Sequence, residues 1–377
     1  MITKIDWRLT SLLISVVIST LDYSVLSVAL PTIAQNFNIT VSEAQMTASL
    51  YLLGSAITFI PLASCANLFG SVAVFRASLL GFSLLSLVLI FTTNFHLLLL
   101  FRFLEGIAGA GIVGLVPALA AAIFPQRRAW ALSLVISASA TGTIMGLPLG
   151  GFAVEYLGWR SIFLLNLPLG LLAFFLSRNL PNLGQIELKN TFIQLLKLPK
   201  FFLALLASML FFAHTFGHII IVPFYLASRG YTPSQTSFFM LIPSLIVIFL
   251  ASVCGIQADK FGFKSVTILG AAILVISSCW QGLTGEVLIG ALGLGIGRCY
   301  FQAANSAKIL SLAPEGSESL ASSLLSITRV LGQALGSIIS GWLWTSLAIG
   351  ETNSAFASVN YLLAFLALVA GLLVYCW

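Results

Sequence analysis

The stretch SLIVIFLASVCGI, residues 244–256, contains no charged residue and shows no alternation of polar and apolar side chains. A β-strand in a membrane barrel alternates between the two kinds of side chain, whereas a helix that faces lipid is continuously apolar. This stretch therefore predicts a membrane-spanning helix.

The whole chain has the same character. Of its 377 residues, 59% are hydrophobic and only 7% are charged, with a mean hydropathy of +1.08. Such a chain is typical of a bilayer protein. A span takes roughly 20 apolar residues in a helix, which pairs every backbone polar group internally. About twelve such segments fit, so we predict an all-α integral membrane protein.

The expected spans form two sets of six. The first set lies near residues 10–33, 45–66, 72–93, 97–120, 129–152 and 160–178, and the second near 201–224, 234–256, 265–281, 286–308, 320–346 and 354–377. Between them, residues 179–200 form the longest polar connection, with spaced apolar residues that allow a short amphipathic surface helix. We predict an N-terminal six-helix bundle (1–178), a cytoplasmic linker (179–200) and a C-terminal six-helix bundle (201–377).

Two patterns recur between the halves. A G-x-x-G-x-G spacing occurs at Gly106, Gly109 and Gly111 and again at Gly290, Gly293 and Gly295. Glycines of this kind let helices approach closely. A dinucleotide-binding loop would need a preceding strand and a following acidic residue, which are missing here. The second match pairs residues 63–72 with 255–264, so the chain has the duplicated halves that are common in transporters.

Basic residues are unevenly distributed among the expected loops. Twelve fall in one set of loops, whereas only Arg160 and Arg229 fall in the opposite set. Loops rich in lysine and arginine stay in the cytoplasm, so both termini are expected there, as an even number of spans requires. The net charge of +6 therefore reflects membrane topology. Because the basic residues are spread over several short loops and form no continuous basic run, we exclude nucleic-acid binding.

Ionisable residues inside the spans are the best candidates for function, because burying each one costs at least ~2.5 kcal/mol. Asp22, Arg102, Glu105 and Arg298 qualify. Low-dielectric surroundings favour a protonated carboxyl group, whereas a nearby guanidinium favours the carboxylate, so movement between states could load and release a proton at Asp22. The alternative is a fixed hydrogen bond to Arg102 that serves packing alone. Glu105, three residues from Arg102, could neutralise it or act as a second titratable group.

Arg298, His214 and His218 are candidates for the substrate cavity. Arg298 follows the glycines of its helix by about one turn, where it could meet an anionic substrate or a structural partner. The two histidines are four residues apart on one helix face, a spacing that suits proton transfer or a bond to a neighbouring helix. Two ligands alone are a weak metal signal, so we expect no metal. Without a nucleotide loop or a Ser/His/Asp arrangement, we also expect no cofactor and no enzymatic activity.

The chain resembles the major facilitator superfamily, and within it the drug/proton antiporters, over essentially its whole length. The matching residues are Leu21–Asp22, Val28–Pro31, Arg102, Gly106, Gly142, Gly146, Pro148, Gly150, Gly151, Trp159–Arg160, Ile162–Phe163, Asn166, Pro168, Gly170, Pro223, Gly230–Gln235, Pro243, Arg329, Gly332 and Gly336. The resemblance implies that the fifth-helix residues (Gly142, Gly146, Pro148, Gly150 and Gly151) control proton leak during the transport cycle.

The resemblance also implies a conformational latch at the cytoplasmic ends of two helices, formed by Asp259, Lys260, Gly262 and Lys264. The equivalent loop of the first half departs from the family pattern, with Asn67 and Leu68 in place of an aspartate and an arginine. Glu105 replaces the usual glutamine, and the proline expected after Gly146 is displaced to Pro148.

Together these features predict a proton-coupled secondary transporter that exports small amphipathic compounds by alternating access. Its partners would be a small-molecule substrate, protons and the lipid bilayer, and we expect a monomer. The resemblance implies a bacterial inner membrane. Alternatives are a dedicated exporter of an endogenous metabolite such as a siderophore, an importer, or a receptor that no longer transports.

Overall fold

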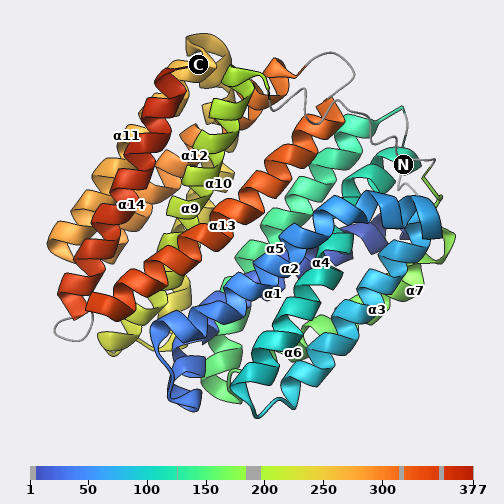
Figure 1. The fold of residues 1–377 in the computed structure, drawn as a ribbon, viewed down its shortest axis with the longest axis horizontal. Coiled ribbons are helices and arrows are strands. Elements are labelled where there is room, and N and C mark those ends of the chain that lie inside the picture. The colour runs from blue at the N-terminus through green and yellow to red at the C-terminus, as the bar shows by residue number, and fades with distance from the viewer. Residues whose placement is uncertain (1–5, 125, 184–196, 314–317, 348–351, 377) are drawn as a thin grey trace. The chain divides into compact units, whose positions relative to one another are not determined.

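The computed structural model describes residues 6–124, 126–183, 197–313, 318–347 and 352–376, and Figure 1 shows their course. The first helices are α1 (Trp7–Phe37), α2 (Val41–Phe69), α3 (Ser71–Ile90), α4 (Phe95–Ile123), α5 (Arg128–Leu157), α6 (Ser161–Leu164), α7 (Asn166–Leu176) and the 3-10 helix η1 (Ser177–Asn179). They are followed by α9 (Pro199–Ser228), α10 (Pro233–Phe261), α11 (Phe263–Thr284), α12 (Val287–Leu312), α13 (Glu318–Leu347) and α14 (Thr352–Tyr375).

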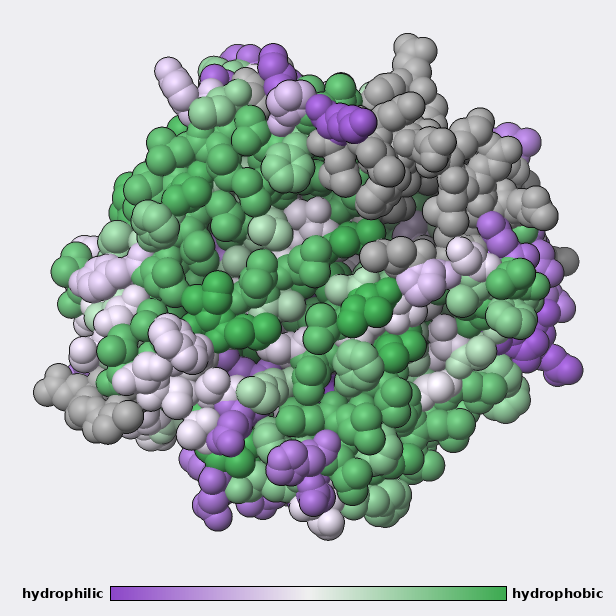
Figure 2. Space-filling model, in the orientation of Figure 1, coloured by the Kyte–Doolittle hydropathy of each residue, from purple (hydrophilic) through white to green (hydrophobic). Residues whose placement is uncertain are grey.

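The prediction of an all-helical membrane protein is confirmed. Within the described ranges there is no strand, and eleven helical segments are long and apolar enough to cross a bilayer. The remaining long helix, α2, has 29 residues. Figure 2 shows a broad hydrophobic surface on the face it presents, with hydrophilic side chains gathered towards its edges. Such a surface is the expected boundary with lipid acyl chains.

The helix ends follow local sequence signals. The Asn94 side chain accepts hydrogen bonds from the backbone N–H groups of His96 and Leu97, so it caps α4. Thr232 and Gln235 form a reciprocal capping box at the start of α10. Gly262 separates α10 from α11 with a φ of 85°, a conformation that glycine adopts without strain.

The chain divides into two compact units. Unit 1 consists of residues 1–32 and 50–187, and unit 2 consists of residues 33–49 and 188–377. Most of the predicted linker, residues 184–196, lies outside the described part of the chain.

The same helix pairs pack together in each unit. In unit 1, α3 packs on α4 and on α7, as α11 packs on α12 and on α14 in unit 2. Gly106 of α4 lies against the Tyr51 backbone of α2, and the corresponding pair α10 and α12 is in contact in unit 2. Gly142 of α5 lies against α1, as α13 packs on α9. This agreement is the structural counterpart of the sequence repeat.

The core of unit 2 is aromatic and tightly packed. Phe211 of α9 stacks on Phe301 of α12, with ring centroids 4.6 Å apart and an interplanar angle of 5°. Apolar residues of α11 and α14 surround this pair, including Leu274 and Ala370. The helices of this unit are therefore held by continuous contacts.

The sixth expected span corresponds to one continuous apolar segment, Ser161–Asn179, whose hydrogen-bond pattern changes at Leu165 although the backbone there stays helical (φ −64°, ψ −33°). Helix α6 ends at Leu164 and α7 begins at Asn166. Pro168 has no backbone N–H to donate to the Leu164 carbonyl group, and its ring crowds that carbonyl. Asn166, the first residue of α7, has a fully buried side chain.

Candidate functional site

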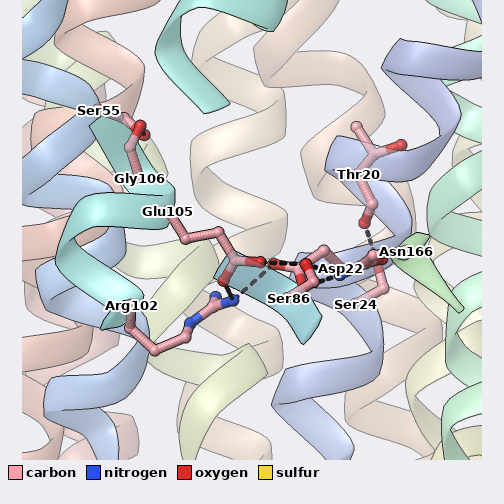
Figure 3. Close-up of polar contacts among 9 residues, drawn as sticks. All are labelled: Thr20, Asp22, Ser24, Ser55, Ser86, Arg102, Glu105, Gly106 and Asn166. Carbon is pink, nitrogen blue, oxygen red and sulfur yellow. Dashed lines mark hydrogen bonds and ion pairs between the residues drawn. The ribbon is translucent and has the colours of Figure 1, made fainter. Parts of the chain in front are cut away.

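A buried polar cluster lies inside unit 1, formed by side chains from four helices (Figure 3). The Asp22 carboxylate on α1 is 2% exposed, and Arg102 and Glu105 on α4 are fully buried. Arg102 Nη1 donates to Asp22 Oδ2 at 2.9 Å and to Glu105 Oε2 at 2.5 Å. The three residues predicted for proton coupling are therefore brought together around one guanidinium nitrogen.

Two further residues complete the cluster. Asn166 Nδ2 donates to Asp22 Oδ1 at 2.7 Å and to Ser86 Oγ at 3.3 Å. The Ser86 hydroxyl donates to Glu105 Oε1 at 2.5 Å. The sequence analysis missed both as site residues, although Asn166 was among the residues of the family resemblance. Its position two residues before Pro168 inside an apolar span was the available signal.

Aromatic rings enclose the guanidinium. The Arg102 Cζ atom lies 4.6 Å from the centroid of the Tyr51 ring and 5.7 Å from that of Phe163. Gly106 makes the first contact possible, because a β-carbon at this position would collide with the Tyr51 carbonyl oxygen. Cation–π contacts of this kind are stronger where water is excluded.

The charges of the cluster leave room for one proton. With both acids ionised, Asp22, Glu105 and Arg102 sum to −1, and one bound proton makes the sum zero. Burial disfavours net charge. With one proton on either acid, the other acid would still pair with the arginine.

The predicted fifth-helix glycines lie against α1, which carries Asp22. A β-carbon on Gly142 would lie 2.5 Å from the Val17 carbonyl oxygen, and one on Gly146 would lie 2.9 Å from Ser24 Cβ. On Gly150 it would lie 2.8 Å from Val25 Cα. Gly151 is also buried, and Pro148 lies inside the helix. The close approach that the glycine spacing predicted is therefore present along this helix pair.

A second polar cluster lies in unit 2 and contains the residues predicted for the substrate cavity, namely the buried His214 and His218 and the half-buried Arg298. His214 Nε2 and His218 Nε2 lie 2.9 and 3.0 Å from Ser278 Oγ on α11. Arg298 Nη2 donates to the Thr215 carbonyl oxygen at 3.2 Å. His218 and Arg298 line one small cavity. No group of three or more His, Cys, Asp and Glu side chains that could bind a metal occurs among the residues described.

The predicted latch is described only in part. The Asp259 side chain lies outside the described residues. Lys260 and Lys264 are exposed, with their Nζ atoms 5.3 Å from the Phe261 ring centroid and 4.5 Å from that of Tyr375. Gly262 forms the turn between α10 and α11. The charge–dipole contacts expected of the latch remain a prediction.

Comparison with known proteins assigns the family. The sequence matches the Major Facilitator Superfamily over residues 12–262 and 205–377. It is 25% identical to the riboflavin transporter RibZ of Clostridioides difficile, covering 86% of this chain and 84% of that protein. It is 24% identical to the multidrug resistance protein Stp of Mycobacterium tuberculosis (strain CDC 1551 / Oshkosh), covering 87% and 74%.

A solved structure has the same fold. It is a bacterial homologue of the human lysosomal transporter Spinster, in an inward-facing and unoccupied conformation. The TM-score is 0.83 with 16% sequence identity, and the match covers 99% of this chain and 97% of that one. At this identity, the likeness concerns the fold alone.

Proposed function

This chain belongs to the Major Facilitator Superfamily, and from that premise we propose that it exports small amphipathic compounds by alternating access, in exchange for protons. Membership of this family makes it an integral membrane transporter and not an enzyme. Proton coupling, the direction of transport and the kind of substrate belong to the proposal.

The observation that carries the proposal is the shared hydrogen bonding of Arg102 Nη1. Asp22 and Glu105 both accept from this atom, in a site closed to solvent. In the proposed cycle, Asp22 takes the proton and Glu105 stays ionised as the partner of Arg102. A buried arginine without a partner would cost several kcal/mol, so Glu105 lowers the free energy of the protonated state. Asp22 takes this proton from the outer side and releases it to the cytoplasm as the compound binds there, and the carboxylate is protonated again after the compound has left on the outer side.

Asn166 suits both protonation states of Asp22. Its amide nitrogen donates to the carboxylate, while its buried Oδ1 atom has no hydrogen-bond partner among the described residues. Rotation of the amide would present Oδ1 to a protonated Asp22, whose O–H could then donate to it. While Asp22 is protonated, the Ser86 hydroxyl would continue to donate its hydrogen bond to the Glu105 carboxylate. The side chains around the two acids thus support one mobile proton.

The relatives favour two kinds of cargo. A multidrug resistance protein among them supports a permissive exporter, whose cavity would be lined largely by apolar and aromatic side chains. The second candidate is an exporter dedicated to one metabolite, and a relative named as a riboflavin transporter favours it. Both candidates share the fold and the proposed proton site.

The remaining roles follow from the same proposal. The α5 glycines would keep α5 tightly packed on α1 and limit proton leak, while Asp259, Lys260, Gly262 and Lys264 would hold one state of the cycle. We place the transporter in a bacterial inner membrane as a monomer. Both termini would lie in the cytoplasm, because the distribution of basic residues favours that orientation.

Proton movement in proteoliposomes tests the proposal. The protein is reconstituted with a pH-sensitive dye inside, and lipophilic cations and amphipathic anions are added in turn. Proton flux driven by at least one compound, absent from empty liposomes, is the expected result. If folded protein moves compounds without proton flux, the coupling is wrong. If no compound elicits flux while riboflavin does, the dedicated exporter is favoured.

A further inference from the structure

Arg298, a half-buried arginine of unit 2, has no acidic partner among the described residues, whereas Arg102 in unit 1 has two. Arg298 donates from Nη2 to the Thr215 carbonyl oxygen, but its Nε atom has no hydrogen-bond partner among the residues described. No acidic side chain in the described ranges forms an ion pair with it. An ionised side chain within a membrane span is expensive without a counter-charge. Within the described part of the chain, the charge of Arg298 is therefore not balanced by an acidic side chain.

The space beside Arg298 is a cavity of about 30 Å³. Its lining is mainly apolar, with Phe239, Met240 and Pro243 on α10 and three polar residues, His218, Gln281 and Arg298. Pockets for whole drug-sized ligands are about 300–1,000 Å³. This cavity is the size of one functional group, so it suits the polar end of a larger compound.

The polar atoms at this cavity are incompletely satisfied. Gln281 Nε2 donates to the Val287 carbonyl oxygen at 3.3 Å, but Gln281 Oε1 has no partner among the described residues. The same is true of the Nδ1 atom of His218 and the Nε atom of Arg298, both of which belong to residues that line the cavity. Buried polar groups are normally hydrogen-bonded, so several such atoms around one cavity indicate a ligand-binding site.

The histidines are tied to one hydroxyl group. Ser278 Oγ has a single proton and can donate to only one of the two imidazoles, so the other ring must donate its Nε2–H to that oxygen. This bond fixes the rings against α11. Only His218 lines the cavity together with Arg298, and an imidazole supplies no negative charge to balance the guanidinium.

We propose that this cavity binds an anionic group of the transported compound, such as a carboxylate, with Arg298 as its counter-charge. The inference rests on the proposed export function and names its substrate class: an amphipathic anion. Arg298 donates to the anionic group from Nε, and Gln281 Oε1 accepts from a neighbouring hydroxyl or amide N–H of the compound. A lipophilic cation would be repelled by Arg298.

Binding of two ligands of equal shape tests this assignment. The probes are 2-naphthoate and 2-naphthamide, which differ in charge, added to the purified protein in lipid nanodiscs without a proton gradient. Isothermal titration calorimetry measures each affinity. The wild-type protein is expected to bind 2-naphthoate at least tenfold more tightly than 2-naphthamide. Arg298→Gln should lose that preference and keep its affinity for the amide.

Two further variants separate recognition from folding. Arg329→Gln removes another half-buried arginine of unit 2 that does not line this cavity, and this variant should keep the preference for 2-naphthoate. Arg298→Lys retains the positive charge and should keep most of the preference for 2-naphthoate.

Inorganic anions test whether the site needs the rest of the compound. Chloride and phosphate are therefore titrated alone as well. If they bind in an Arg298-dependent way and compete with 2-naphthoate, the site accepts free anions as well as the charged end of a compound.

Three results would overturn the inference. They are equal affinity of the wild-type protein for both probes, a preference that persists in Arg298→Gln, and a preference that Arg329→Gln loses equally. Because binding is measured without a gradient, the result is independent of proton coupling. Failure of the export proposal appears as missing proton flux, whereas failure of this one appears as missing charge preference.

Discussion

Arg102 on α4 donates to Asp22 on α1 across 80 positions of sequence, through an Nη1–Oδ2 contact of 2.9 Å between two side chains that are closed to solvent. The same nitrogen donates to Glu105. One cation thus pairs with two acids, and the proposed proton coupling rests on this arrangement. The consequences can be tested separately for each residue.

Substitution of Asp22 should uncouple transport from proton movement. Asp22→Asn is nearly isosteric and can still accept from Arg102 and bond to Asn166, so the protein should fold. It has no carboxyl group to protonate, and compound-driven proton flux in proteoliposomes should fall at least tenfold. The matched control is Asp6→Asn, which removes an acid that pairs with Arg8 in a partly exposed position near the N-terminus. Equal loss in both variants would contradict the role of Asp22.

Removal of the shared cation should destabilise the protein. Arg102→Met leaves Asp22 and Glu105 buried together without a counter-charge, and breaking a buried ion pair on one side costs about 3–5 kcal/mol. A variant that also carries Asp22→Asn and Glu105→Gln has no buried charge in this cluster and should recover most of the thermal stability. It should remain inactive in proton flux. Thermal unfolding of the purified variants checks the first point, and a triple variant as unstable as Arg102→Met would argue against an electrostatic cause.

The charged members of the site could be predicted from sequence, because each charge inside an apolar span is costly and therefore conspicuous. Asp22, Arg102 and Glu105 were found in this way, as was Arg298. The helical fold followed from the same contrast between apolar runs and charged loops. The glycine spacing at Gly142 and Gly146 also predicted a close helix contact correctly.

The neutral members could not be predicted. Asn166, Ser86 and Gln281 carry no charge, and amides and hydroxyls occur throughout membrane helices. Their roles depend on how each helix is rotated about its axis, which periodicity does not determine in a helix that is apolar all round.

Loss of the Asn166 amide should slow proton coupling and leave cargo binding intact. Asn166→Ala removes the 2.7 Å hydrogen bond to Asp22 and the acceptor proposed for its protonated form. The expected result is a severalfold fall in compound-driven proton flux, with the affinity for 2-naphthoate within twofold of the wild-type value. Asn360→Ala is the matched control, because Asn360 is a buried amide of unit 2 that bonds within its own helix. A similar fall in Asn360→Ala would assign the effect to general packing.

The proposed orientation can be tested at a native cysteine. Cys376 is exposed near the end of α14, whereas Cys254 and Cys299 are buried. If the C-terminus is cytoplasmic, a membrane-impermeant maleimide should label inside-out vesicles and spare right-side-out ones. Cys376→Ser should abolish the labelling. Preferential labelling of right-side-out vesicles would reverse the orientation inferred from the basic residues.

Two glycine-to-alanine substitutions should separate close packing from helix propensity. At Gly142 the added methyl group would meet the Thr20 hydroxyl and lie 2.5 Å from the Val17 carbonyl oxygen, so α1 and α5 must move apart. Overpacking of this kind costs about 1–3 kcal/mol. At Gly255, inside α10, a β-carbon meets nothing within 4 Å. There alanine removes the entropic disadvantage of glycine in a helix and should stabilise by up to ~1 kcal/mol. The melting temperature should therefore fall for Gly142→Ala, and it should stay level or rise for Gly255→Ala.

The same two variants test the proposed control of proton leak. Because the methyl group at Gly142 would displace the helix that carries Asp22, proton leak across liposomes in the absence of compound should also rise in Gly142→Ala but not in Gly255→Ala. A lower melting temperature without extra leak would restrict the α5 glycines to packing.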